Sequence, residues 1–129
     1  MNLVKYIHMK EDVGRWWKKA KKDLSTAKFL LDGEKYEESA FFSQQAAEKA
    51  LKALCLKKFG KIRKIHDLVE LGRDANLPEE LLEKAKELTL AYVYSRYPDI
   101  EEAEDMEKAA ADFLKYAEKI TKWSRKNLS

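Results

Sequence analysis

The chain has 129 residues, a formal net charge of +3 and a single cysteine, and 38% of its residues are charged. This length fits one domain over residues 1–129 that buries roughly two-thirds of the surface its unfolded chain exposes. The lone Cys55 excludes a disulfide framework or a cysteine-based metal site within one chain. No stretch of about 18 uncharged apolar residues occurs, so we expect no membrane association and a cytoplasmic location.

The amino-acid composition and the positions of glycine and proline predict an all-α fold. Leu and Ala occur 31 times, whereas Val, Ile and Thr occur 12 times, which favours helices over strands. The first predicted helix runs from about Asp12 to Leu31, where apolar residues recur every three or four positions. Gly33 follows it, and we expect this glycine to take the left-handed conformation that closes a helix.

The second predicted helix, from about Tyr36 to Phe59, has an apolar arc wider than half its circumference. This width is typical of a central helix with neighbours on two sides. The opposite, polar arc is interrupted by Phe41, Leu56 and Phe59, which predict a partner surface. We expect a homodimer through this arc or through the Trp-bearing flanks.

A basic connection follows Gly60, and a short helix is expected from about Asp67 to Asp74. Pro78 fits the first turn of a helix that should continue to about Ser95. The last helix should run from about Glu102 to Arg125. The expected architecture is therefore an antiparallel up-and-down bundle of four long helices plus one short helix.

Three segments together resemble the HEPN family, the higher eukaryotes and prokaryotes nucleotide-binding domains. They read QQAAEKALKAL from Gln44 to Leu54, HDL from His66 to Leu68, and SRYPD from Ser95 to Asp99. The resemblance implies a five-helix bundle that is commonly dimeric. It also implies association with nucleotides or RNA, in many members beside a nucleotidyltransferase partner and often in toxin-antitoxin systems.

Other members of the family are metal-independent ribonucleases in which four to six residues separate an Arg from a following His. If Arg96 is that arginine, the histidine position falls on Glu101, Glu102 or Ala103, so the motif is not intact. Three functions stay open: a nucleotide- or RNA-associated protein, an atypical ribonuclease using Arg96 and His66, or a non-catalytic dimerisation module. No metal or cofactor is expected.

Each candidate residue has a structural alternative. Arg96 and His66 are candidate catalytic residues, although Arg96 could instead pair with Asp99, and His66 could orient the short helix with Asp67 as its N-cap. Glu48, Lys49 and Lys52 could form a polar cleft with Gln45, or Glu48 and Lys52 could be an ordinary surface pair. The candidate ligand-binding residues are Arg63, Asp67, Tyr97, Asp99, Glu48 and Lys49.

Overall fold

The computed structural model describes residues 2–91 and 103–129, which form five helices and no strand. The helices are α1 (Leu3–Asp32), α2 (Tyr36–Phe59), α3 (Leu68–Asp74), α4 (Glu79–Leu88) and α6 (Ala103–Leu128). The all-α prediction is confirmed. No helix in these described ranges is both long and apolar enough to cross a membrane.

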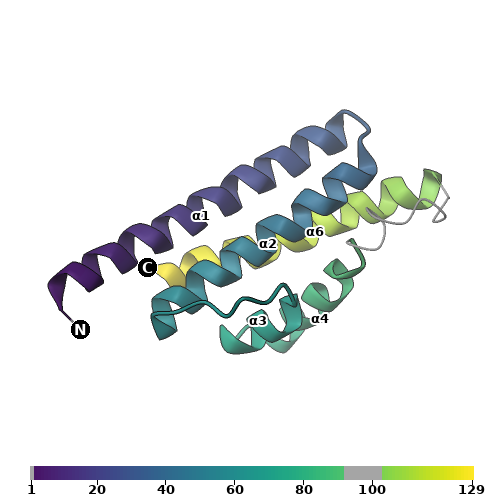
Figure 1. Ribbon diagram of the computed structural model, residues 1–129. Helices are drawn as coiled ribbons and strands as arrows, with labels where there is room; N and C mark the ends of the chain where they lie inside the picture. The colour runs from purple at the N-terminus through teal and green to yellow at the C-terminus, as the bar shows by residue number, and fades with distance from the viewer. Residues whose placement is uncertain (1, 92–102) are drawn as a thin grey trace.

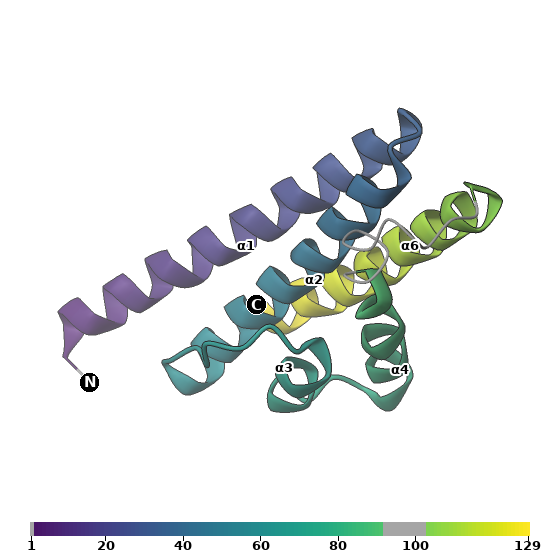
Figure 2. The same ribbon diagram turned by 45° about the vertical axis from the view of Figure 1, so that its right-hand side comes forward.

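Three long helices, α1, α2 and α6, lie side by side, and the shorter α3 and α4 cover one side of α2 and α6 (Figure 1). The chain direction alternates through α1, α2, α4 and α6, so α2 and α6 run the same way (Figure 2). As predicted, α2 is the central helix, since it contacts α1, α6, α3 and α4.

The small side chains of α2 allow the other helices to pack closely around it. Five of its alanines have no exposed surface at all: Ala40, Ala46, Ala47, Ala50 and Ala53. Alanine removes little side-chain entropy in a helix and lets a neighbouring helix come close. Ser39 adds a polar tie, because its Oγ donates a 2.7 Å hydrogen bond to the carbonyl oxygen of Ala27 in α1.

The larger core side chains come from four different helices. Leu51 of α2, Leu71 of α3, Leu88 of α4 and Ile120 of α6 are fully buried and belong to one apolar cluster. Removing such a side chain from water contributes about 1.5–3 kcal/mol. The short helices are therefore held on the bundle by apolar contacts, which fixes the segment leading into α3.

The ends of α1 differ from the prediction. The helix begins nine residues earlier, at Leu3, where the side chain of Asn2 accepts a 2.8 Å hydrogen bond from the backbone N–H of Lys5. At its other end Gly33 has φ −88°, and Glu34 takes the left-handed conformation with φ 61°. The expectation for Gly33 was wrong because the left-handed turn falls one residue later.

The helix predicted to reach Ser95 is interrupted earlier. α4 ends at Leu88, and a turn at Thr89 separates it from helical residues at 90–91. Thr89 Oγ1 donates a 3.1 Å hydrogen bond to the carbonyl oxygen of Ala85, competing with the continuing helix ladder. α6 extends three residues past its predicted end, to Leu128.

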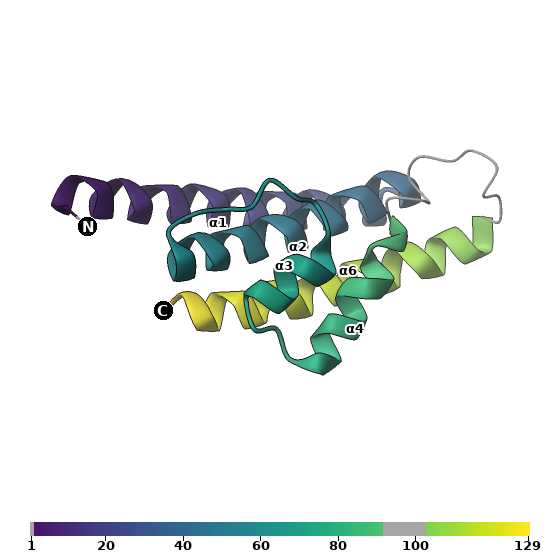
Figure 3. The ribbon, with the colours of Figure 1, turned by 60° about the horizontal axis from the view of Figure 1, so that its bottom comes forward.

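The connection between α2 and α3 runs back along α2 (Figure 3). Gly60 reverses the chain with φ 73° and ψ 7°, a conformation that costs a side-chain-bearing residue about 1–2 kcal/mol. His66 consequently lies beside Glu48, which precedes Gly60 by about 18 Å of helix at 1.5 Å per residue. The extended connection, and not the short helix, carries the chain back, so that His66 lies beside the midpoint of α2.

Candidate functional site

Asp67 fixes the point at which the returning connection becomes α3. Its Oδ1 accepts hydrogen bonds from the backbone N–H groups of Val69 and Glu70, at 2.9 and 3.1 Å. These bonds satisfy two amides that a helix start leaves without intrahelical partners. The predicted N-cap is confirmed, so the structure gives Asp67 a positioning role immediately after His66.

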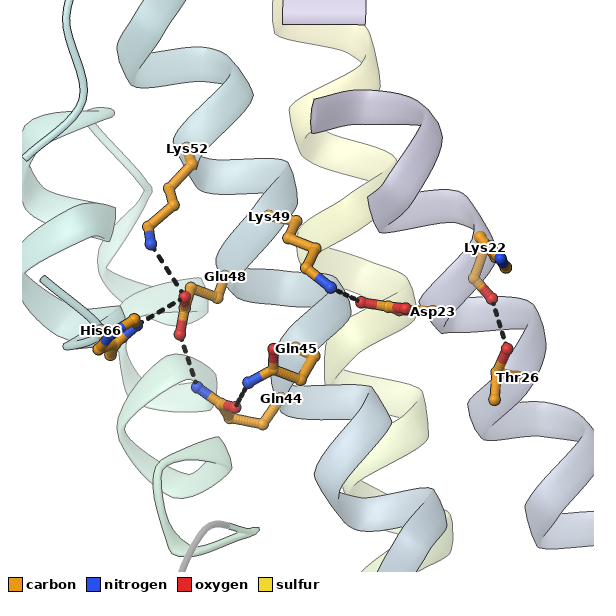
Figure 4. A network of polar contacts seen from close by, with 9 residues as sticks. All are labelled: Lys22, Asp23, Thr26, Gln44, Gln45, Glu48, Lys49, Lys52 and His66. Carbon is orange, nitrogen blue, oxygen red and sulfur yellow. Dashed lines mark hydrogen bonds and ion pairs between the residues drawn. The ribbon is translucent and has the colours of Figure 1, made fainter. Parts of the chain in front are cut away.

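His66 contacts a buried carboxylate. Its Nδ1 lies 2.9 Å from Glu48 Oε2, although 82% of the imidazole is exposed and Glu48 is buried (Figure 4). A carboxylate oxygen only accepts hydrogen bonds, so Nδ1 carries the proton that bridges the two groups. Nε2 is then the nitrogen available to a ligand.

Two further α2 side chains hold the carboxylate of Glu48. Lys52 Nζ donates to Oε2 at 3.0 Å, and Gln44 Nε2 donates to Oε1 at 3.2 Å. Lys52 is itself buried, and its Nζ lies 5.4 Å from the centre of the Trp16 ring on α1. The alternative of an ordinary surface pair between Glu48 and Lys52 was wrong, because the returning connection and α1 cover it.

Lys49 belongs to a separate contact. Its Nζ donates to Asp23 Oδ2, which joins α2 to α1 on the side of α2 away from His66 (Figure 4). Asp23 is buried, and Lys49 is mostly buried. Glu48 and Lys49 therefore do not line one cleft. Glu48 contacts His66, whereas Lys49 belongs to the interface between α1 and α2.

The arrangement resembles the support that a carboxylate gives to a histidine ligand or base. A buried, fully paired carboxylate fixes the ring orientation and the tautomer of the imidazole. An imidazole held in this way can donate a hydrogen bond to a phosphate oxygen when protonated. It can accept a proton from a hydroxyl when neutral.

The guanidinium of Arg63 pairs with carboxylates of α3. Its Nε donates to Asp74 Oδ2 at 2.9 Å, and its guanidinium also lies 3.8 Å from Glu70. Both contacts hold the basic connection against α3. Arg96, Tyr97 and Asp99 lie outside the described residues. Among the residues that are described, no group of three His, Cys, Asp or Glu side chains could hold a metal ion.

Cys55 lies in the core and not in the site. It is buried, and its Sγ lies 3.7 Å from the carbonyl oxygen of Leu71. Burial raises the pKa of the thiol to about 11, with a smaller contribution from the charge of Asp74. A thiol with so high a pKa is almost entirely protonated near neutral pH and is therefore a poor nucleophile.

The predicted partner surface on α2 is mostly covered by the chain itself. Leu56 is buried, and Phe41 is half-buried with its ring against Phe42. Only Phe59 of the three predicted residues is largely exposed. Leu56 is therefore not available to a partner, because an apolar residue on a polar arc can still face a neighbouring helix, and the homodimer stays a prediction.

Comparison with known proteins identifies the family to which this arrangement belongs. The HEPN domain family matches residues 13–128, which include every described site residue. The chain belongs to the HEPN domain family. No curated protein matched the chain.

Three solved structures are similar to this HEPN protein. TT1696 from Thermus thermophilus is 31% identical with a TM-score of 0.78, covering 89% of this chain and 97% of its own. ST0689, an archaeal HEPN homologue, is 33% identical with a TM-score of 0.75, covering 91% and 98%. An HEPN domain protein from Thermotoga maritima, TM0613, is 28% identical with a TM-score of 0.72, covering 87% and 95%.

Three residues of this HEPN site were not among the predicted site residues: Lys52, Gln44 and Trp16. Lys52 and Gln44 stand one helical turn on either side of Glu48, so helical spacing alone places all three on one face. Trp16 carries no such signal. Its position beside Lys52 depends on how α1 packs against α2.

Proposed function

We propose that this HEPN protein binds a phosphate-bearing ligand, a nucleotide or an RNA, at His66, and that it acts with a nucleotidyltransferase partner in a toxin-antitoxin-like system. The observation that supports the binding site is the exposed His66 imidazole on the buried Glu48 carboxylate. Membership of the HEPN family supports the ligand class, and the contact between His66 and Glu48 supports the choice of residue.

The supporting contacts favour an anionic ligand. The positive charge of Lys52 compensates the negative charge of Glu48, so no uncompensated carboxylate lies beside the imidazole. The exposed imidazole Nε2 can then form a charge-assisted hydrogen bond with a phosphate oxygen, which contributes about 1.5–3 kcal/mol. Lys61 and Lys64 on the same exposed connection add positive charge for a polyanion.

Binding measured by fluorescence anisotropy with a labelled single-stranded RNA, and by calorimetry with ATP, tests the site. His66→Ala should weaken binding of the true ligand by about tenfold or more, the effect of one charge-assisted hydrogen bond. His8→Ala is a matched control, because His8 is the other histidine of the chain and lies exposed on α1. Equal loss in both variants, or none in His66→Ala, would overturn the assignment.

A second candidate is a metal-independent ribonuclease, and the Glu48–His66 hydrogen bond favours it. A carboxylate that orients an imidazole prepares Nε2 to take the proton of a ribose 2'-hydroxyl. A cation would still be required for the charge that develops on the phosphate. Arg96 is the proposed source of that cation, with Tyr97 and Asp99 as its proposed ligand-binding neighbours.

Cleavage of RNA in EDTA separates the two candidates. An active wild type, with His66→Ala and Arg96→Ala each reducing the rate by at least about a hundredfold, supports the ribonuclease. Binding without cleavage supports the non-catalytic site. Cleavage that survives in His66→Ala points to a contaminating nuclease or to another catalytic base.

The nucleotidyltransferase partner has its own test. A nucleotidyltransferase gene beside the gene for this chain identifies the candidate, and co-expression followed by sedimentation velocity shows whether the two proteins form a complex. His66→Ala and wild type should both associate if the partner binds elsewhere on the HEPN domain. Absence of both a neighbouring gene and a complex contradicts this part of the proposal.

A further inference from the structure

A cavity of about 390 Å³ lies at one end of the bundle and shares no residue with the His66 site. The C-terminal ends of α2 and α6 lie beside the N-terminal half of α1 there (Figures 1 and 2). Most of the lining comes from α1, whereas α2 contributes Lys57 and α6 contributes Leu128. Cavities that bind small molecules measure about 300–1,000 Å³, so this one has room for a small ligand.

The wall of the cavity is mostly apolar. Met9, Val13 and Trp17 recur every four residues, so they form one stripe along α1. Leu128 of α6 lines the same cavity, and all four side chains are half-buried. Water against such a wall finds few hydrogen-bond partners. An apolar group that displaces this water is therefore bound favourably.

Two lysines bring positive charge to this apolar cavity. Among the described residues that line it, only Lys10 and Lys57 are charged. Lys10 Nζ lies 5.5 Å from the centre of the Tyr6 ring, and Lys57 Nζ donates to the carbonyl oxygen of Leu128. Both of these partners are neutral, and both lysines are exposed. Their charges are therefore available to an anion.

We propose that this cavity binds an alkyl carboxylate, with the hydrocarbon chain against the apolar stripe and the carboxylate at Lys10 and Lys57. An apolar wall beside two lysines complements both parts of such a ligand. A nucleic-acid backbone would satisfy the lysines but would leave the wall in contact with water. The flat surface of a bilayer would not fill a concave site. The proposal is independent of the function proposed for His66.

Titration calorimetry of the full chain with sodium hexanoate, octanoate and decanoate, each below its micelle concentration, tests the site. The dissociation constant should fall about fourfold for each added methylene until the cavity is full, the fold-change that corresponds to about 0.8 kcal/mol. Decanoate should bind saturably, with a dissociation constant below about 1 mM.

The charge of the head group gives a second readout. Octylamine, which is protonated near neutral pH, should bind at least about tenfold more weakly than octanoate, because it brings another cation to the two lysines. Lys10→Gln combined with Lys57→Gln should remove this preference without lowering the melting temperature, since both side chains are exposed. Lys18→Gln is the matched control. Lys18 is exposed on α1 beside Trp17 but does not line the cavity.

Filling the cavity tests the apolar wall. Val13→Phe should weaken the binding of octanoate by at least about tenfold, because the ring takes the space of the hydrocarbon chain. Circular dichroism of this variant shows whether the helices are retained. The exposed lysine variants test the same cavity by a change that does not alter its apolar wall.

Four results would overturn the proposal. The first is the absence of saturable decanoate binding below about 1 mM. The second is equal affinity for octanoate and octylamine, because the lysines would then recognise no carboxylate. The third is an octanoate affinity that falls as the protein concentration rises, which would assign the cavity to a second copy of the chain. The fourth is binding to phosphatidylglycerol vesicles without binding to free octanoate, which would assign it to a membrane surface.

Discussion

His66 Nδ1 lies 2.9 Å from Glu48 Oε2, although the two residues are 18 positions apart and on different segments. One side chain is largely exposed and the other is buried. The exposed member can meet a ligand, and the buried member depends on its neighbours for charge compensation. Substitutions at the two positions should therefore have different consequences.

Glu48→Leu should reduce the free energy of unfolding by about 3–5 kcal/mol, because it leaves the ammonium of Lys52 buried without its counter-charge. Glu48→Leu combined with Lys52→Met should cost less than Glu48→Leu alone, since no uncompensated charge remains. Urea unfolding of both variants measures the difference.

The matched control uses an exposed pair with the same spacing. Lys108 donates a 2.9 Å hydrogen bond to Asp112 on α6, and its side chain is 79% exposed. Lys108→Ala should cost no more than about 0.5 kcal/mol. If Glu48→Leu costs as little as this control, the Glu48–Lys52 pair is hydrated and our account of its burial is wrong.

His66→Ala and Asp67→Ala should separate function from stability at adjacent positions. His66→Ala should change the free energy of unfolding by less than about 1 kcal/mol, as expected for an exposed contact. Asp67→Ala should cost about 1 kcal/mol, because two amides at the start of α3 lose their acceptor. Thermal melts followed by circular dichroism, alongside RNA binding, distinguish them; a ligand defect only in Asp67→Ala would contradict the assignment.

Gly60→Ala should destabilise the chain by about 1 kcal/mol or more, since Gly60 adopts a left-handed conformation with φ 73°. Gly14→Ala should have the opposite sign, stabilising by up to about 1 kcal/mol, because Gly14 lies within α1 and a Cβ there meets nothing. The comparison of melting temperatures needs no ligand. Equal changes in melting temperature for the two variants would show that the backbone conformation at Gly60 and Gly14 does not determine the effect of the added methyl group.

The pKa of Cys55, raised to about 11 from its ordinary value of 9.0, predicts slow alkylation. Near pH 8 the folded chain should hold about a hundredfold less thiolate than the unfolded chain, in proportion to the two-unit difference in pKa. Iodoacetamide labelling followed by mass spectrometry, with and without urea, measures this ratio. Rapid labelling of the folded chain would show that the thiol is accessible.

The same pKa fixes the sign of a pH dependence. Below pH 9 the thiol is neutral in both states, and from about pH 9 to 11 the unfolded chain loses its proton first. The contribution of Cys55 to the free energy of unfolding should therefore decline as pH rises through this window. Comparison with Cys55→Ala isolates the contribution, because the variant lacks the titrating group.

Local sequence signals predicted α2 well and α1 poorly. The apolar arc of α2 and the stop at Gly60 gave both ends of that helix, because a helix surrounded by neighbours repeats its pattern along its whole length. The first nine residues of α1 were missed. Apart from Met9, their apolar side chains are exposed, so they fall outside the periodic stripe that reveals a core-facing helix.

The residues of the site could be predicted from the sequence, but their burial could not. His66, Asp67 and Glu48 were candidates from their chemistry, and helical spacing already suggested Lys52 as a partner of Glu48. Their burial depends on the connection that returns along α2 and on Trp16 from α1. Such long-range contacts leave no signature in local spacing, which makes a buried ion pair look like a surface one.

The returning connection divides the site into a rigid half and an adaptable half. α2 is enclosed by other helices, so Glu48 cannot move without disturbing alanines that have no free space around them. His66 instead sits on an exposed segment anchored at Gly60 and at the start of α3. Adjustment to ligands of different size therefore falls to the connection, while the carboxylate supplies a fixed reference point to which the imidazole returns.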